Sequence, residues 1–279
     1  MNEENLILKS WLQQKKVFLE NLIASCKLPT KDSVHDLRVA VKKMRSYLRL
    51  NEHFSDEDWH GSFSSIKVLF KSFGKLRDFD MSLGLCRKQE RKLEISLPAF
   101  KEYLIANRSL TRRWAKRSAI DFDQQQQVFD LQFNHFDGLS PEETCGKIIL
   151  LVSEKIKKVK RLKKHFQKNA HEIRKQLKDV LYWLKICPKE FSKNVVHLKN
   201  LDLCLKYLGS WQDDYIFRRK IKQYIDGLAS SSEKQILNDL EKKIITDQKE
   251  LLKKAEKKIN EIENKKATMK VAFGAPDGS

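Results

Sequence analysis

Two short segments of this sequence place a histidine and an arginine at the same spacing. The first is His35-Asp36-Leu37-Arg38, followed by Lys42, and the second is His171-Glu172-Ile173-Arg174, followed by Lys178. Because an α-helix turns about 100° per residue, positions three and seven residues after the histidine return to its side of the helix. Each segment therefore predicts a helix with histidine, arginine and lysine on one face, a combination that suits the binding of phosphate groups.

The helix around the first segment carries a longer row of cations. The row falls within an arc of roughly 80°, and its members are His35, Arg38, Lys42, Arg45 and Arg49. The adjoining arc is apolar and holds Val34, Leu37, Val41, Met44 and Leu48. A basic row beside an apolar stripe predicts that this helix forms the wall of a groove, whereas the simpler interpretation is an ordinary solvated face.

Other basic residues extend this pattern. The face around the second histidine holds His171, Arg174, Lys178 and Lys185, with Lys175 nearby and Leu181 at the position of Arg45. A row of period four comprises Lys67, Lys71 and Lys75, and Lys206 occupies the position of Lys71 in the second half. Residues 155–168 are the most basic segment and contain no acid, and Lys157, Arg161, Lys164 and Lys168 share one face if their helix continues.

The overall charge indicates what these rows bind. The 279 residues include 56 Lys and Arg against 37 Asp and Glu, a formal net charge of +19. Such an excess destabilises a compact fold through self-repulsion, and its presence points to an anionic partner. Same-face positions on a helix rise by about 5–6 Å, a spacing that suits an extended chain of phosphates. We expect inorganic polyphosphate as the ligand, with nucleic acid as the alternative ligand of the same surface.

A second pair of similar segments indicates that the sequence is duplicated. Residues 73–78 (FGKLRD) resemble residues 208–213 (LGSWQD) at an offset of 135, almost the 136 that separates His35 from His171. Gly (9) and Pro (5) are scarce, and good helix formers are plentiful. We therefore predict an all-α fold that consists of two related helical bundles.

Turn and cap residues predict where these bundles and their helices begin and end. The predicted parts are a first bundle over 1–120, a connecting loop over 121–139, a second bundle over 140–266 and a disordered tail over 267–279. Asp32 or Ser33 is expected to cap the second helix, and the run from Ser140 predicts a capped start with proline at the first position. Gly74 and Gly209 are each expected to end a helix, and Asp78 is expected to cap the next one.

The same segments resemble the CHAD family, the conserved histidine α-helical domain. The pattern V-H-x-x-R-V-x-x-K-K-M-R covers residues 34–45, H-x-x-R-K-x-x-K-x-x-L-Y covers 171–182, and residues 74–80 are similar to the family's L-G-x-x-R-D-x-D segment. The resemblance implies two pseudo-symmetric four-helix bundles around a basic central groove that binds polyphosphate, in a protein that associates with polyphosphate granules. Leu181 and Tyr215 depart from the family pattern, which often has an arginine and an aspartate-type continuation there.

The sequence also argues against several other functions. The two histidines have no metal-ligand partners at a suitable spacing, and a helix cap is favoured over Mg²⁺ binding for the pairs Asp78/Asp80 and Asp213/Asp214. Phosphate loops and nucleophile motifs are absent, so we expect neither a cofactor nor catalysis. Five cysteines without a C-x-x-C spacing indicate a reducing compartment, and the lack of a long apolar run or signal peptide predicts a cytoplasmic protein without a membrane partner.

Overall fold

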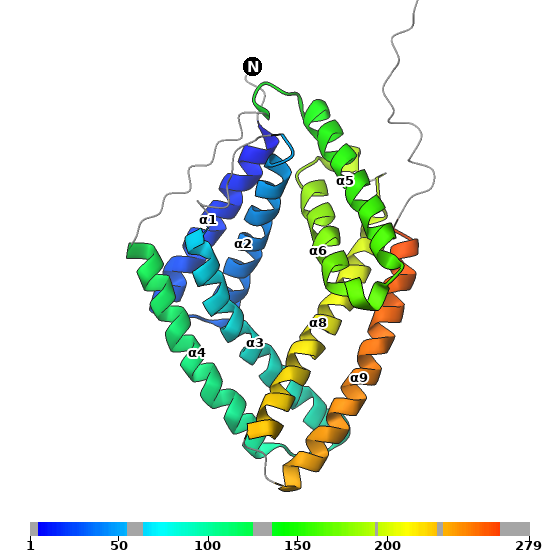
Figure 1. The fold of residues 1–279 in the computed structure, drawn as a ribbon. Helices are drawn as coiled ribbons and strands as arrows, with labels where there is room; N and C mark the ends of the chain where they lie inside the picture. Colours follow the sequence, from blue (N-terminus) through cyan, green and yellow to red (C-terminus); the bar gives the residue numbers. More distant parts are fainter. Residues whose placement is uncertain (1–4, 55–63, 125–135, 193–194, 228–230, 263–279) are drawn as a thin grey trace, which may run out of the picture. The chain divides into compact units, whose positions relative to one another are not determined.

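The computed structural model describes residues 5–54, 64–124, 136–192, 195–227 and 231–262. Their regular structure is entirely α-helical, as predicted (Figure 1). The helices are α1 (Leu6–Lys27), α2 (Lys31–Asn51), α3 (Ser64–Leu93), α4 (Pro98–Gln124), α5 (Pro141–Lys163), α6 (Phe166–Leu184), α7 (Lys189–Ser192), α8 (Leu198–Gly227) and α9 (Ser231–Asn260). The predicted tail at 267–279 and most of the predicted loop at 121–139 lie outside the described residues.

Local side-chain chemistry sets the starts of α2 and α5. Ser140 caps α5 by a capping box with Glu143, and Pro141 occupies the first turn, as predicted. The start of α2 was predicted wrongly, because Thr30 is the N-cap and Ser33 is its partner three residues later in the capping box. The Ser33 hydroxyl accepts a hydrogen bond from the Thr30 backbone N–H at 3.0 Å.

The expected helix ends at Gly74 and Gly209 do not occur. Helix α3 runs through Gly74 and α8 runs through Gly209. Asp78 and Asp213 therefore lie in helix interiors and are not N-caps. A glycine in a helix interior costs about 1 kcal/mol relative to alanine and does not by itself end the helix. At Gly74, the guanidinium of Arg38 from α2 lies where a side chain would begin.

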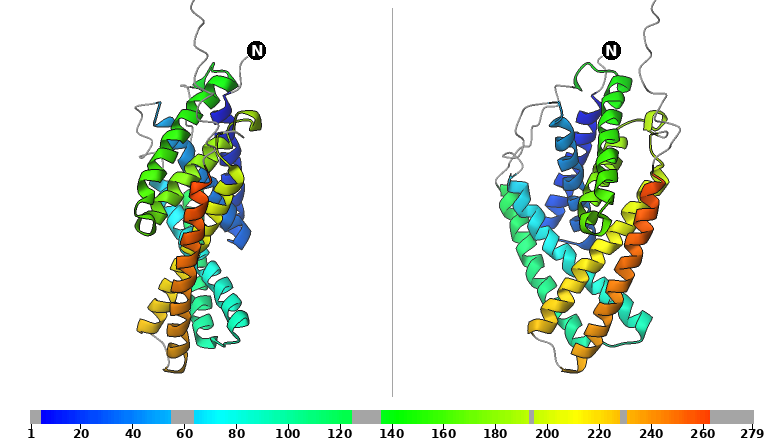
Figure 2. Two further views of the ribbon diagram at one scale, coloured as in Figure 1. Left: turned by 90° about the vertical axis from the view of Figure 1, so that its right-hand side faces the viewer. Right: turned by 45° about the vertical axis from the view of Figure 1, so that its right-hand side comes forward.

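The chain divides into two compact units, and α8 and α9 each contribute to both. We call Ile7–His135 with Ser210–Glu250 the α1–α4 unit. We call Met1–Leu6, Phe136–Gly209 and Leu251–Ser279 the α5–α7 unit. The division falls inside α8 and α9, and within each unit the segment of α8 lies beside the segment of α9 (Figure 2).

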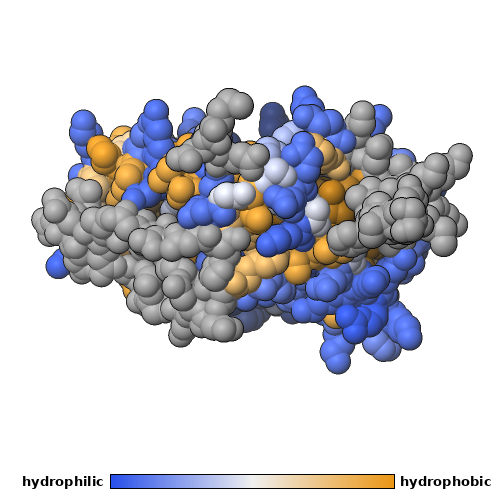
Figure 3. Space-filling view, turned by 90° about the horizontal axis from the view of Figure 1, so that it is seen from above, coloured by the Kyte–Doolittle hydropathy of each residue, from blue (hydrophilic) through white to orange (hydrophobic). Residues whose placement is uncertain are grey.

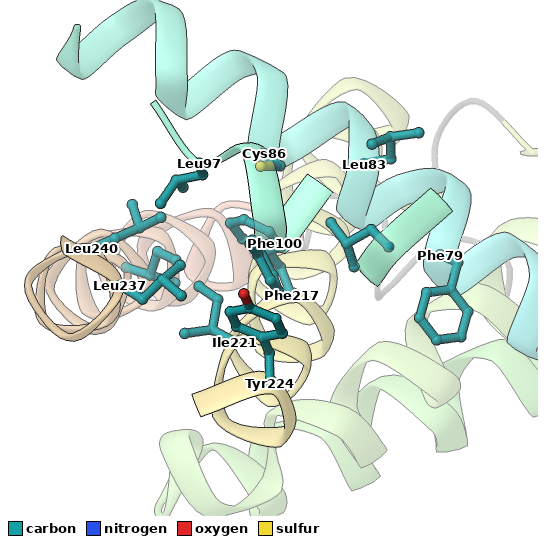
Figure 4. Packing of buried hydrophobic residues seen from close by; sticks show 12 residues of the cluster. Phe79, Leu83, Cys86, Leu97, Phe100, Phe217, Ile221, Tyr224, Leu237 and Leu240 are labelled. Carbon is teal, nitrogen blue, oxygen red and sulfur yellow. The ribbon is translucent and has the colours of Figure 1, made fainter. Parts of the chain in front are cut away.

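The core of the α1–α4 unit joins α3 and α4 to the adjacent segments of α8 and α9 (Figure 4). Phe100 of α4 packs on Phe217 and Tyr224 of α8, with ring centroids 6.1 and 5.2 Å away. Glu233 of α9 is buried and accepts hydrogen bonds from the backbone N–H groups of Ala99 and Phe100, at 2.9 and 3.1 Å. A carboxylate from α9 thus caps the N-terminus of α4.

The α5–α7 unit is held together by α5, which packs against α6 and α7. Ile173, Leu177 and Trp183 of α6 are fully buried. Toward the end of the described chain, the His197 N–H donates to the Ile262 carbonyl at 2.8 Å and connects the α8 and α9 segments of this unit.

The described surface is mostly hydrophilic on the face in Figure 3, with apolar side chains between the polar ones. None of the described helices combines the length and the apolar character that crossing a bilayer requires.

Candidate functional site

Helix α2 places its basic row beside a fully packed stripe. Val34, Leu37, Val41, Met44 and Leu48 are at most 5% exposed, which confirms the predicted core face. On the basic side, His35 and Arg45 are exposed, whereas Arg38, Lys42 and Arg49 are half-buried. The members of the row therefore differ in their access to solvent.

Arg38 is directed onto α3. Its Nη1 donates a hydrogen bond to the Phe70 carbonyl at 2.8 Å, and its Cζ lies 4.2 Å from the centroid of the Phe70 ring. Burial lowers the pKa of Arg38 to about 10, against the raising effect of Asp78. The guanidinium thus connects α2 to α3 by a charge-assisted hydrogen bond and a cation–π contact.

Gly74 makes room for this guanidinium. A Cβ at position 74 would lie 2.8 Å from Arg38 Nη1. The corresponding pair in the other half is Arg174 and Gly209, where a Cβ would lie 4.0 Å from Arg174 Nη2. In each half of the sequence, the arginine of the histidine–arginine motif therefore lies against the glycine of the second repeated motif. The contact is closer in the first half than in the second. Both motifs are visible in the sequence, but the arginine was predicted to contact the ligand and the glycine to end a helix.

Asp78 lies on the same side of α3 among several cations. Burial raises the pKa of the Asp78 carboxyl above its ordinary value, and the nearby charges Arg38, Lys220 and Arg77 act in the opposite direction. Asp213 of α8 adds to the rise in the Asp78 pKa. The position that was predicted to be a cap is instead an acid inside a mainly basic cluster.

Lys220 of α8 belongs to this cluster and was missed at the sequence level. Its Nζ lies 3.9 Å from the centroid of the Phe79 ring. Burial lowers the pKa of Lys220, and the nearby cations Arg219 and Lys75 lower it further, against the effect of Asp78. A signal was available in the run Arg218, Arg219, Lys220 and Lys222, but nothing in the sequence shows that it packs beside α3.

Lys75 reaches the same cluster from α3. It is exposed, and its Nζ lies 4.7 Å from the ring centroid of Trp114 on α4. Lys67 and Lys71 of the same row are exposed as well. The α1–α4 unit thus brings cations from α2, α3 and α8 to the region around Asp78.

The acidic pairs that were considered for Mg²⁺ have other surroundings. Asp80 forms an ion pair with Arg108. Burial raises the pKa of Asp214 to about 6, with a further contribution from Asp247 and Asp213. Among the described residues, no group of three or more His, Cys, Asp or Glu side chains is placed to hold a metal ion.

In the α5–α7 unit, the basic row lies along α6. His171 and Lys175 are exposed, and Arg174 and Lys178 are half-buried. Lys175 is 3.0 Å from the carboxylate of Glu172. Lys206 is exposed on the α8 segment of this unit. This row belongs to a different unit from the row on α2.

The basic segment at 155–168 does not form one continuous track. Helix α5 ends at Lys163 and α6 begins at Phe166, so the helix does not continue and the condition for a single face through Lys157, Arg161, Lys164 and Lys168 is not met. All four side chains are exposed around the end of this helical hairpin. Two hollows of about 450 and 500 Å³ occur there, lined by residues that include Arg161 and Lys168 respectively.

Comparison with known proteins relates this architecture to a described domain. A family model of the CHAD domain matches residues 14–222. The crystal structure of the CHAD domain from the plant Ricinus communis is similar, with a TM-score of 0.72 and 15% sequence identity over 93% of this chain and 92% of that chain. At this identity the likeness shows the fold alone. No curated protein matches the sequence.

Proposed function

Since the chain belongs to the CHAD domain family, we propose that it binds inorganic polyphosphate through the basic faces of its two units. The observation that supports this most directly is the cluster around Lys220, where burial and the nearby cations Arg219 and Lys75 lower the Lys220 pKa against the effect of Asp78. Like charges that a fold holds together cost free energy, and a multivalent anion offsets that cost.

The chemistry of the cluster suits a chain of phosphates. Each phosphate in such a chain supplies oxygens that accept hydrogen bonds from lysine and arginine. A single phosphate would offset only part of the charge that α2, α3 and α8 contribute, whereas a chain presents a charge at every repeat. The exposed row of Lys67, Lys71 and Lys75 continues from the cluster along α3, with about one helical turn between successive lysines.

Not every predicted ligand residue has the same role in this proposal. His35, Arg45, Lys71 and Lys75 are exposed and are proposed to contact the polyanion directly, together with Lys220. Arg38 already donates to the Phe70 carbonyl, so we assign it to holding α2 on α3. In the α5–α7 unit, His171, Lys175, Lys178 and Lys206 are the proposed contacts, with the cations of the α5–α6 hairpin beside them.

Titration calorimetry with long-chain polyphosphate tests the proposal. The variant Lys75→Ala/Lys220→Ala should lose at least about tenfold in affinity, which corresponds to about 0.7 kcal/mol for each lost cation. The matched control Lys234→Ala/Lys249→Ala removes two exposed lysines of α9 in the same unit and should lose much less. An equal loss in both variants would mean that only net charge matters, and the assignment of the cluster would be wrong.

Two further measurements separate this function from its alternatives. Affinity for polyphosphate should fall as the salt concentration rises, because the counterions bound to polyphosphate are released when the protein binds it. Competition with single-stranded RNA of equal total charge distinguishes polyphosphate from nucleic acid, and preference for RNA would favour the nucleic-acid alternative. The exposed Tyr215 ring, which stacks on Trp211 with centroids 6.3 Å apart, is a place where a base could stack.

We also propose that binding occurs without catalysis and that the protein collects at polyphosphate granules in the cytoplasm. Polyphosphate incubated with the pure protein and Mg²⁺ should keep its chain length on a gel, since a shortened or lengthened ladder would indicate an enzyme. A fluorescent fusion should colocalise with a polyphosphate stain, and the Lys75→Ala/Lys220→Ala variant should do so less.

A further inference from the structure

Two of the five cysteines lie side by side in the α5–α7 unit. Cys145 is in the second turn of α5, and Cys187 lies in the short connection between α6 and α7. Because α5 packs against both α6 and α7, the two thiols come into hydrogen-bond contact although they are 42 positions apart in the sequence. Both are free thiols, and they are only 1% and 6% exposed.

The contact makes the two sulfurs chemically unequal. The hydrogen bond between the two thiols lowers the pKa of Cys145, and the same contact together with burial raises the pKa of Cys187. Cys145 is thus the sulfur that more readily becomes a thiolate, which is the nucleophilic form. By contrast, burial raises the pKa of Cys86 and of Cys204 to about 12, so these thiols are expected to be inert.

We propose that Cys145 and Cys187 are a redox modification site at which hydrogen peroxide converts the two thiols into an intramolecular disulfide. Their burial favours an oxidant of this small size over a bulky disulfide reagent. The two thiols meet through the packing of α5 against α6 and α7, which does not depend on polyphosphate binding.

The reaction is a two-electron oxidation in two steps. The Cys145 thiolate attacks one peroxide oxygen, the O–O bond breaks, and the departing hydroxide takes up a proton to give water, leaving a sulfenic acid. The Cys187 sulfur then attacks the sulfenic sulfur, loses its proton, and forms the S–S bond as a second hydroxide leaves and becomes water. Two thiols lose two electrons and two protons, and one peroxide becomes two waters.

The cross-link would connect the beginning of α5 to the connection between α6 and α7. A disulfide that closes a loop of this length restrains the unfolded chain, so the oxidised protein should melt at a higher temperature than the reduced protein. Reduction with dithiothreitol should restore the original melting temperature, because the site consists of free thiols in the reduced fold.

The test uses the folded, full-length protein. After treatment with hydrogen peroxide and removal of the excess, thiol titration under denaturing conditions should fall from five to three, and peptide mass mapping should find a Cys145–Cys187 cross-link. Cys145→Ser and Cys187→Ser should each abolish this cross-link. Cys26→Ser, which changes a half-buried cysteine on α1, should retain it.

The wild-type measurement alone decides the proposal, even if a serine variant folds poorly. Five thiols that survive peroxide treatment, a disulfide that maps to other cysteines, or a cross-link between two molecules would each overturn it. Oxidation of Cys145 to a sulfinic acid without a cross-link would overturn it as well, because Cys187 would then not be placed to resolve the sulfenic acid.

Discussion

The contact between Arg38 and Gly74 leads to a prediction that runs against ordinary helix propensity. In an open helix interior, replacing glycine by alanine stabilises by about 1 kcal/mol. At position 74, however, the new methyl carbon would lie 2.8 Å from Arg38 Nη1, closer than side-chain carbons normally approach. The guanidinium must move, and its hydrogen bond to the Phe70 carbonyl at 2.8 Å is lost or weakened.

The two effects can be compared in magnitude. A hydrogen bond from a charged donor contributes about 1.5–3 kcal/mol, and the gain in helix propensity offsets about 1 kcal/mol of its loss. We therefore expect Gly74→Ala to lower the free energy of unfolding by about 0.5–2 kcal/mol. Urea unfolding followed by far-ultraviolet circular dichroism measures this as a lower midpoint with an unchanged slope.

The chain supplies matched controls for this substitution. Gly84 lies on the same helix and a Cβ there meets nothing within 4 Å, so Gly84→Ala should stabilise the protein. At Gly209, the Cβ would make ordinary contact with Arg174 at 4.0 Å, so Gly209→Ala should be neutral or stabilising.

A double variant isolates the contact itself. In an Arg38→Ala background the guanidinium is absent, so adding Gly74→Ala should stabilise by about the normal propensity of 1 kcal/mol. If Gly74→Ala stabilises wild-type protein as much as Gly84→Ala does, Arg38 yields without cost and our account of why the two motifs recur together is wrong.

Three further predictions concern the α1–α4 unit. Glu233→Ala should destabilise by about 1–3 kcal/mol in chemical denaturation, because the N-terminal N–H groups of α4 lose a charged acceptor. Glu94 has a φ of 54° just after α3, where the Ile95 N–H bonds to the Glu90 carbonyl at 3.2 Å, so Glu94→Gly should raise the melting temperature, with a gain of up to about 1 kcal/mol. Burial raises the pKa of Asp214 to about 6, so the protonated form favours folding and this contribution is lost as pH rises through about 6. Asp214→Asn should therefore be more stable than wild type at about pH 8 and no more stable at about pH 4 in thermal melts.

Each of these has a result that would contradict it. An unchanged unfolding midpoint in Glu233→Ala would show that water replaces the carboxylate as the cap of α4. Destabilisation by Glu94→Gly would mean that the side chain of Glu94 contributes more than its backbone conformation costs. A gain in Asp214→Asn that is equal at both pH values would exclude titration of this carboxyl as its cause.

Features that depend on neighbours in the chain could be predicted from the sequence. Helical periodicity determined that the apolar stripe from Val34 to Leu48 is buried beside a basic row, because 3.6 residues per turn places these positions on one side of any helix. The capping box at Ser140 and Glu143 was equally local, since donor and acceptor lie three residues apart. Composition and the repeated motifs sufficed for the all-α class.

The tertiary structure alone decided which helix faces meet. Gly74 resembles a helix end in the sequence. In the structure it lies inside a continuous helix, and its missing side chain leaves room for Arg38 of α2. Lys220 joins a cluster with Lys75, and Cys187 meets Cys145, only because distant helices pack together. Helix periodicity and caps are properties of a few consecutive residues. These contacts depend instead on which faces of distant helices pack together, and residue spacing along the chain does not specify that packing.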